Sequence, residues 1–188
     1  MQQDMPDREM PETYIPNLEQ SVPANSQYTR DEWQTLVETP IKVGRAMMAV
    51  SPSGAIGMTQ EIMALRKCYT EAFQSTRNPV LLNLRQHLQD KDTMQSIWEH
   101  AGRAFGDRWD ATNVRQTALQ ACQRVDNLLR KLSPQDARAY KDFLYNTVLK
   151  IAEAAREGGI MGMGGVAVSA DEKALLSDIS TTLGISHS

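Results

Sequence analysis

The stretch SPQDARAYKDFLYNTVLKIAEAAREGG, residues 133–159, indicates a helical fold. Ser133 and Pro134 form a helix start, because a serine caps well and a proline in the first turn has no N–H group to satisfy. Apolar residues then recur every three or four positions, which places them on one face of a helix. These residues are Ala137, Tyr140, Leu144, Val148, Ile151 and Ala155. Gly158 suits the left-handed conformation at a helix end, so the stretch predicts one long amphipathic helix.

The sequence before residue 133 and after residue 159 contains similar apolar stripes. These stripes predict helices that begin near residues 29, 57, 78, 92, 110 and 169. In a capping box, the first side chain and the side chain three positions later each bond the other residue's backbone N–H group. Such boxes are predicted at residues 29–32, 92–95 and 169–172. Pro40 is expected to bend or split the first helix. Only residues 166–168 alternate as a short strand would, so the sequence predicts an all-α, compact bundle of seven to eight helices.

Residues 1–28 differ in composition from the rest of the chain. They contain four of the eight prolines and no periodic apolar pattern, which is typical of a disordered or extended leader. Their acidic residues outnumber their single arginine, whereas the whole chain of 188 residues has a net charge of only −3. We therefore expect an acidic leader at residues 1–28 and a single, nearly neutral helical domain at residues 29–188.

Charge and hydropathy argue against several classes of partner. A nearly neutral domain lacks the basic face that nucleic-acid binding needs, so no nucleic-acid partner is expected. No apolar run approaches the ~20 residues that span a bilayer, and no basic face adjoins the apolar segments, so we expect no membrane contact. The first residues do not form a secretory signal, and the isolated Cys68 and Cys122 fit a reducing compartment. We expect a cytoplasmic protein.

The segment EGGIMGMGGVAVSADEK, residues 157–173, bears on function. Residues 162–167 match the pattern G-x-G-x-x-A, but the dinucleotide fingerprint follows a strand, and here a helix precedes it. The lysine of a phosphate-binding P-loop is also missing, so we expect no nucleotide and no other cofactor. The glycines permit a tight turn, and the apolar residues between them either pack under the core or form a contact surface.

Two interpretations of this loop lead to different functions. In the first, the apolar residues of this loop and of the loop near residue 55 bind a protein partner. The candidates are Ile56, Met58, Ile160, Met161 and Met163. In the second, flanking carboxylates hold a metal ion in a sensor or an enzyme. The candidates are Glu157, Asp171 and Glu172. Because carboxylates at a helix N-terminus commonly serve as caps, the first interpretation is favoured.

A short internal repeat relates the two loops. Residues 39–46 and 147–154 share the pattern T-x-x-K-x-x-x-A, and a glycine-bearing apolar segment follows each, at residues 54–58 and 159–163. The repeat predicts two helix–loop–helix halves related by a pseudo-twofold axis.

Residues 147–186 combine a helix, an acidic-glycine turn at residues 157–158, the helix start VSADE at residues 168–172 and a last helix that ends in LGIS at residues 183–186. This arrangement resembles the tellurite-resistance TerB-like family, although that family often has Asp-Gly at the turn. The composition is also similar to that of uncharacterised bacterial all-helical proteins. The TerB-like resemblance implies a pseudo-duplicated helical domain that acts as a bacterial stress-associated adaptor without known catalysis.

The histidines and cysteines match no established catalytic or zinc-binding pattern. His87, His100 and His187 lack the spacings of zinc sites, and His87 is expected on the polar side of its helix. A nucleophilic pair of Cys122 with His100 remains an alternative, but Cys122 lies on an apolar stripe, which favours a buried and inert thiol. The sequence thus predicts a non-enzymatic interaction module with a protein partner, and it is compatible with a homodimer. A metal-responsive sensor or an enzyme is the alternative.

Overall fold

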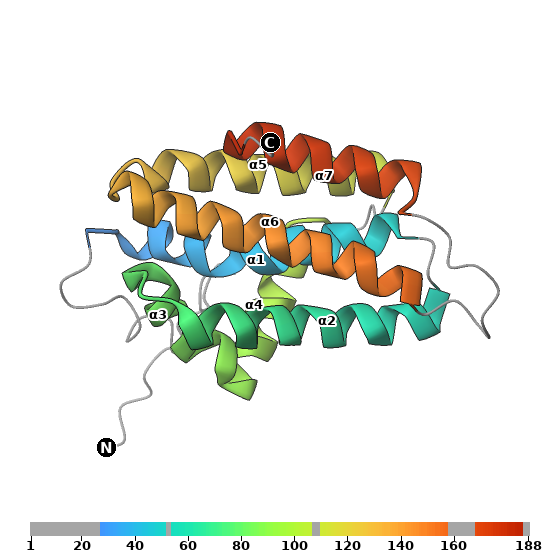
Figure 1. Ribbon diagram of the computed structural model, residues 1–188, viewed down its shortest axis with the longest axis horizontal. Helices are drawn as coiled ribbons and strands as arrows, with labels where there is room; N and C mark the ends of the chain where they lie inside the picture. The colour runs from blue at the N-terminus through green and yellow to red at the C-terminus, as the bar shows by residue number, and fades with distance from the viewer. Residues whose placement is uncertain (1–26, 52–53, 107–109, 158–167, 186–188) are drawn as a thin grey trace, which may run out of the picture.

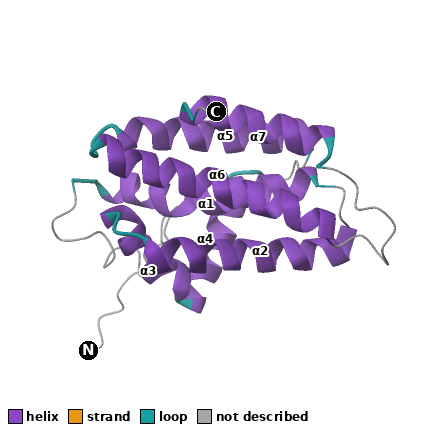
Figure 2. Cartoon of the chain, viewed as in Figure 1, coloured by secondary structure: helices purple, strands orange, loops and turns teal. Residues whose placement is uncertain are grey.

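The structure, a computed structural model, describes residues 27–51, 54–106, 110–157 and 168–185, with only the backbone described at 54–61, 75 and 155–157. Over these residues the chain forms seven α-helices and no strand (Figures 1 and 2). The helices are α1 (Arg30–Val50), α2 (Gly54–Ser75), α3 (Pro79–Gln89), α4 (Lys91–Arg103), α5 (Ala111–Leu129), α6 (Pro134–Glu157) and α7 (Ala170–Leu183). The predicted all-α bundle is confirmed.

Helices α1 and α6 pack against each other in the middle of the bundle (Figure 1). Helices α5 and α7 lie on one side of this pair, and α2 lies on the other side against α6. The hairpin of α3 and α4 completes the bundle, with α3 against α2 and α4 against α1. None of the helices in the described ranges is long and apolar enough to cross a membrane.

The apolar stripes of the helices meet in one continuous core. Trp33, Phe73, Phe105 and Tyr140 are its largest fully buried side chains, and they come from four different segments of the chain. The stripe predicted for residues 133–159 is buried from Tyr140 to Ile151. Burial of each large apolar side chain contributes about 1.5–3 kcal/mol, so the bundle is held mainly by this core.

Helix α1 continues through Pro40, so Pro40 does not split the helix, and the expected bend stays a prediction. A proline has no N–H group, and the carbonyl four residues earlier therefore loses its helical hydrogen bond. That carbonyl belongs to Leu36, and the hydroxyl of Tyr140 in α6 donates a hydrogen bond to it over 2.6 Å. A side chain of α6 thus supplies the hydrogen bond that the Leu36 carbonyl lacks within α1.

Most of the predicted helix starts are confirmed. Thr29 with Glu32 and Ser169 with Glu172 form the predicted capping boxes. The box predicted at residues 92–95 is wrong, because α4 begins earlier and Asp90 is its N-cap. The Asp90 carboxylate accepts a hydrogen bond from the backbone N–H of Thr93 over 2.8 Å. Asp90 also ends α3, so a single residue connects the two helices of the hairpin.

Two aromatic side chains that the sequence places outside the core, His87 and Tyr28, are buried. The expectation that His87 lies on the polar side of α3 is wrong, because its ring packs edge-on against Trp33 with centroids 6.1 Å apart. Residue 87 lies three positions after the buried Leu84, so it shares that helix face. Tyr28, at the end of the expected leader, is also buried, and the Lys131 ammonium lies 5.6 Å from its ring centroid. The leader before residue 27 lies outside the described residues.

The two copies of the internal repeat share one local feature. Thr39 and Thr147 occupy matching positions, and both hydroxyls donate to the carbonyl four residues earlier, at Thr35 and Phe143. The segments that follow the two copies fall largely outside the described side chains. The pseudo-twofold relation therefore stays a prediction.

Candidate functional site

The predicted partner-binding residues cannot be located by their side chains. Ile56 and Met58 lie in the first turns of α2, where only the backbone is described. Ile160, Met161 and Met163 lie outside the described residues. The proposed contact surface of the two loops therefore stays a prediction.

The three carboxylates predicted to bind a metal have different environments. Glu157 is the last residue of α6, and its side chain is not described. Asp171 is exposed in the first turn of α7. Glu172 is buried, and its carboxylate accepts a hydrogen bond from the backbone N–H of Ser169 over 2.7 Å. Among the residues with described side chains, no three histidine, cysteine or acidic groups are close enough to hold an ion, and this interpretation also stays a prediction.

The two cysteines lie in environments that keep them protonated. Burial raises the pKa of the Cys122 thiol to about 12. Burial also raises the pKa of Cys68, whose sulfur lies 3.5 Å from the Thr147 hydroxyl oxygen. Because the thiolate is the reactive form of cysteine, neither residue is suited to nucleophilic attack.

His100 forms a buried polar cluster with residues of α1. Its Nδ1 lies 2.6 Å from Oε1 of Glu38, a carboxylate that is only 3% exposed. Gln34 donates to the same oxygen over 2.7 Å, and Lys42 donates to Oε2 over 2.6 Å. The three α1 residues follow one another at intervals of four, so they share one face of the helix. The cluster ties α4 to α1.

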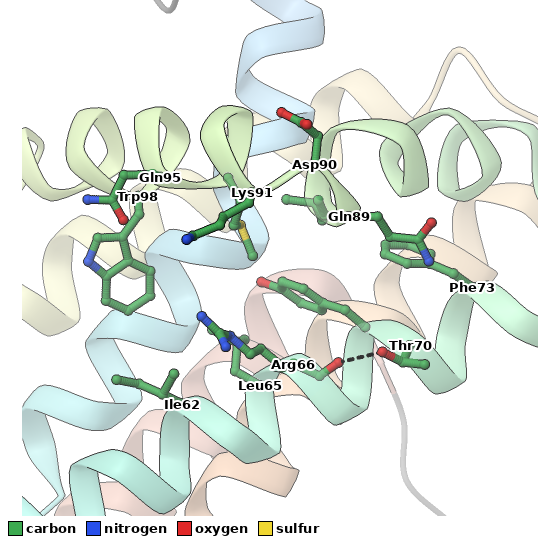
Figure 3. Close-up of a pocket in the computed structure, with 13 residues that line it drawn as sticks. Ile62, Leu65, Arg66, Thr70, Phe73, Gln89, Asp90, Lys91, Gln95 and Trp98 are labelled. Carbon is green, nitrogen blue, oxygen red and sulfur yellow. Dashed lines mark hydrogen bonds between the residues drawn. The ribbon is translucent and has the colours of Figure 1, made fainter.

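A cavity of about 580 Å³ lies between α2 and the α3–α4 hairpin (Figure 3). Its buried wall is apolar and is formed by Leu65, Tyr69, Phe73 and Leu88. Half-buried and exposed side chains complete the lining. These are Ile62, Arg66, Thr70, Gln89, Asp90, Lys91, Met94, Gln95 and Trp98.

The cavity follows from two helix faces. On α2, residues 62, 65, 66, 69, 70 and 73 recur at helical spacing, and on α4 residues 91, 94, 95 and 98 do the same. The sequence pattern assigns the apolar members of both sets to the core. The structure confirms this for Leu65, Tyr69 and Phe73, which belong to the core. Met94 and Trp98 are only partly buried against the core, and the cavity lies beside these side chains.

Trp98 lies at one edge of the cavity, and Arg45 of α1 holds it in place. The Arg45 guanidinium lies 4.4 Å from the Trp98 ring centroid, and its Nη1 donates to the Trp98 carbonyl over 3.2 Å. Gly102 leaves room for this arginine, since a Cβ atom there would lie 3.0 Å from the guanidinium. Together with the Glu38–His100 pair, this contact holds the α4 side of the cavity in place.

The apolar wall contains one polar atom without a partner. The Tyr69 hydroxyl is buried, and it has no hydrogen-bond partner among the described residues. Burial raises its pKa well above the usual value, so the group is a neutral phenol that keeps its proton and can donate only a hydrogen bond. The Tyr69 ring packs against the rings of Phe73 and Phe143, with ring centroids 6.1 and 5.5 Å apart. The hydroxyl is thus enclosed in the core behind the wall.

Two exposed cations point into the same space beside the apolar wall (Figure 3). Arg66 reaches it from α2 and Lys91 from the start of α4, and neither forms an ion pair within the described ranges. Asp90 is the one acidic residue of the lining whose side chain the structure describes, and its carboxylate points away from the cavity. The hydrogen bonds that Asp90 accepts at Thr93 lower its pKa and hold it as the cap of α4.

Parts of this site have a signal in the sequence. The positions next to the apolar stripes, Arg66 on α2 and Lys91 on α4, are both basic, which suggests a pair of cations once the helices are placed together. Nothing local to either helix indicates that the two stripes face each other across a space. The spacing of Gln34, Glu38 and Lys42 likewise marks a polar stripe, but it does not identify His100 as the partner.

Comparisons of this chain with protein families, curated proteins and solved structures find no match. The resemblance to the tellurite-resistance TerB-like family therefore stays a prediction. The size, lining and charge of the cavity are the basis for a functional proposal.

Proposed function

We propose that this chain is a non-enzymatic binding module and that the cavity between α2 and the α3–α4 hairpin is its binding site. The observation that carries the proposal is an apolar cavity of about 580 Å³ with two exposed cations on its edge. Small-molecule sites typically measure about 300–1,000 Å³ and combine apolar walls with a few directed polar groups. The cavity has both properties.

The groups around the cavity favour binding over catalysis. The described part of the lining contains no histidine or cysteine, and its one carboxylate caps a helix. General acid–base catalysis needs a proton donor or acceptor within hydrogen-bond reach of the reacting atoms. The Tyr69 hydroxyl is enclosed and keeps its proton, whereas the exposed Arg66 and Lys91 can orient a ligand.

A fluorescence titration tests the proposal. N-phenyl-1-naphthylamine is uncharged and becomes fluorescent in an apolar site, so it reports on the cavity independently of the two cations. We expect saturable binding with one probe per chain. Met94→Trp should weaken probe binding by about tenfold or more, because the larger ring occupies the space between α2 and α4.

Met63→Trp is the matched control. Met63 lies on α2 and is 64% exposed, and it is not part of the lining. This variant should bind the probe as the original chain does. Gln95→Trp, at an exposed lining position, replaces Met94→Trp if that variant does not fold by circular dichroism. Equal probe binding by lining and control variants, or binding to many sites per chain, would show that the proposal is wrong.

A further inference from the structure

We propose that the ligand of this cavity is a small amphipathic carboxylate, that is, a molecule with one carboxylate and one apolar chain or ring system. This inference rests on the proposed function, and it specifies the chemical class of the ligand. It commits to a dissolved single-chain molecule rather than to the surface of a lipid bilayer.

The charge of the site is the first argument. Arg66 and Lys91 come from different helices and point into the same space beside the cavity wall (Figure 3). An anion at the edge of the cavity is attracted to both cations, and because both are exposed, salt weakens this attraction. Among the described side chains of the lining, Asp90 is the one acidic group, and it points away from the cavity and caps α4.

The geometry of these cations favours a carboxylate. An arginine guanidinium presents parallel N–H groups that match the two oxygens of a carboxylate, and a lysine adds a third donor from another direction. Both side chains are exposed, so a ligand can reach them without a rearrangement of the core. The carboxylate would thus lie at the edge of the cavity, in contact with solvent.

The apolar wall of the cavity favours a ligand whose remaining part is apolar. Leu65, Phe73 and Leu88 are almost fully buried and offer only apolar surface. Met94 and Trp98 on α4 face them across the cavity and are half-buried. An apolar chain or ring gains about 25 cal/mol for each Å² that it removes from water, whereas a second charged group in this position would be desolvated without a partner.

Displacement of N-phenyl-1-naphthylamine by three ligands of equal chain length tests the inference. The ligands are decanoate, decanol and decyltrimethylammonium, which differ mainly in the charge of the head group. We expect decanoate to displace the probe at a concentration lower than decanol by a factor of roughly 10 to 100, as expected for hydrogen bonds to charged groups. The cationic ligand should be the weakest, and added salt should reduce the preference for decanoate.

The double variant Arg66→Gln/Lys91→Gln should still bind the neutral probe but should lose the preference for decanoate. Lys67→Gln/Arg77→Gln is the matched control, because both residues are exposed cations outside the lining and the pair of substitutions removes the same two charges. Equal displacement by decanol and decanoate, or an unchanged preference in the double variant, would overturn the inference and leave the proposed function standing. Absence of probe binding to the original chain would refute the proposed function itself.

A final measurement distinguishes a dissolved ligand from a membrane lipid. Vesicles of phosphatidylglycerol carry anionic head groups on an apolar bilayer. We expect no sedimentation of the protein with these vesicles. Sedimentation that decanoate does not compete away would overturn the assignment to a dissolved carboxylate.

Discussion

Among single residues, Tyr140 and Pro40 illustrate how one helix compensates for a defect in another. Pro40 deprives the Leu36 carbonyl of its helical partner, and the Tyr140 hydroxyl donates to that carbonyl over 2.6 Å. Both residues are buried, so no solvent can replace the bond. The pair therefore joins α1 to α6 at the centre of the bundle.

We expect Tyr140→Phe to lower the free energy of unfolding by about 1–3 kcal/mol, because it leaves the Leu36 carbonyl buried without a donor. Urea denaturation followed by circular dichroism measures this change. In a Pro40→Ala background the helix can supply its own N–H group, so the same substitution should cost less. Equal costs in the two backgrounds would show that Tyr140 does not compensate for the proline.

The buried Glu38 carboxylate depends on its partners in a similar way. We expect His100→Leu to destabilise the protein by about 1–3 kcal/mol, because the buried Oε1 of Glu38 keeps Gln34 but loses the Nδ1 group 2.6 Å away. The second substitution Glu38→Met should restore part of this loss, since an apolar pair of similar size avoids the desolvation of a buried charge. Thermal and urea unfolding of the single and double variants test this expectation. An additive loss would contradict it.

Among the helices, short segments define their own boundaries. Helix α7 begins with the capping box of Ser169 and Glu172 and ends at Gly184, which has φ 63° and ψ 37°. The backbone N–H of Gly184 bonds back to the carbonyls of Ser180 and Thr181, as in other helix ends of this kind. These interactions involve neighbours in sequence, which is why the helix ends could be predicted.

We expect Gly184→Ala to destabilise the protein by about 1–2 kcal/mol, because an L-residue with a Cβ atom is strained at this positive φ. A Cβ atom at residue 184 would have no neighbouring atom within 4 Å, so strain alone accounts for the effect. Gly184→Asn should cost less, since asparagine tolerates the left-handed region better than alanine does. Urea denaturation of both variants measures the difference, and a reversed order would contradict this explanation.

Across the whole molecule, ion pairs connect helices that are distant in sequence. Lys131 bonds to Glu32, and Lys150 bonds to Glu71 on α2. The hydrogen bond from Lys131 lowers the pKa of Glu32, and the hydrogen bond from Lys150 lowers the pKa of Glu71. Both carboxylates are therefore easier to ionise in the folded protein than in the unfolded chain.

This linkage predicts acid sensitivity. The usual pKa of both groups is 4.5, and their pKa is lower in the folded state. At a pH between the folded-state pKa and 4.5, the unfolded chain therefore binds more protons than the folded protein does. The two carboxylates thus contribute stability above pH 4.5, and this contribution is lost as the pH falls through their folded-state pKa. We expect the melting temperature to fall below this pH. Glu32→Gln/Glu71→Gln should flatten the decline, whereas Glu99→Gln, at an exposed position, should not.

The helical class, the apolar stripes and most helix starts follow from local sequence. These features depend on the period of the helix and on side chains that cap nearby N–H groups, so they can be read within a few residues. Where two caps compete locally, as Asp90 and Asp92 do at the start of α4, the pattern does not identify the one that the chain uses.

Packing between distant helices determines where the cavity forms. The apolar residues of α2 belong to the core and those of α4 are partly buried against it, and α4 is held against α1 by the Glu38–His100 pair and by Arg45. Those contacts join residues more than fifty positions apart, so no local pattern contains them. The space beside Tyr69 and the convergence of Arg66 with Lys91 exist only after that packing is complete.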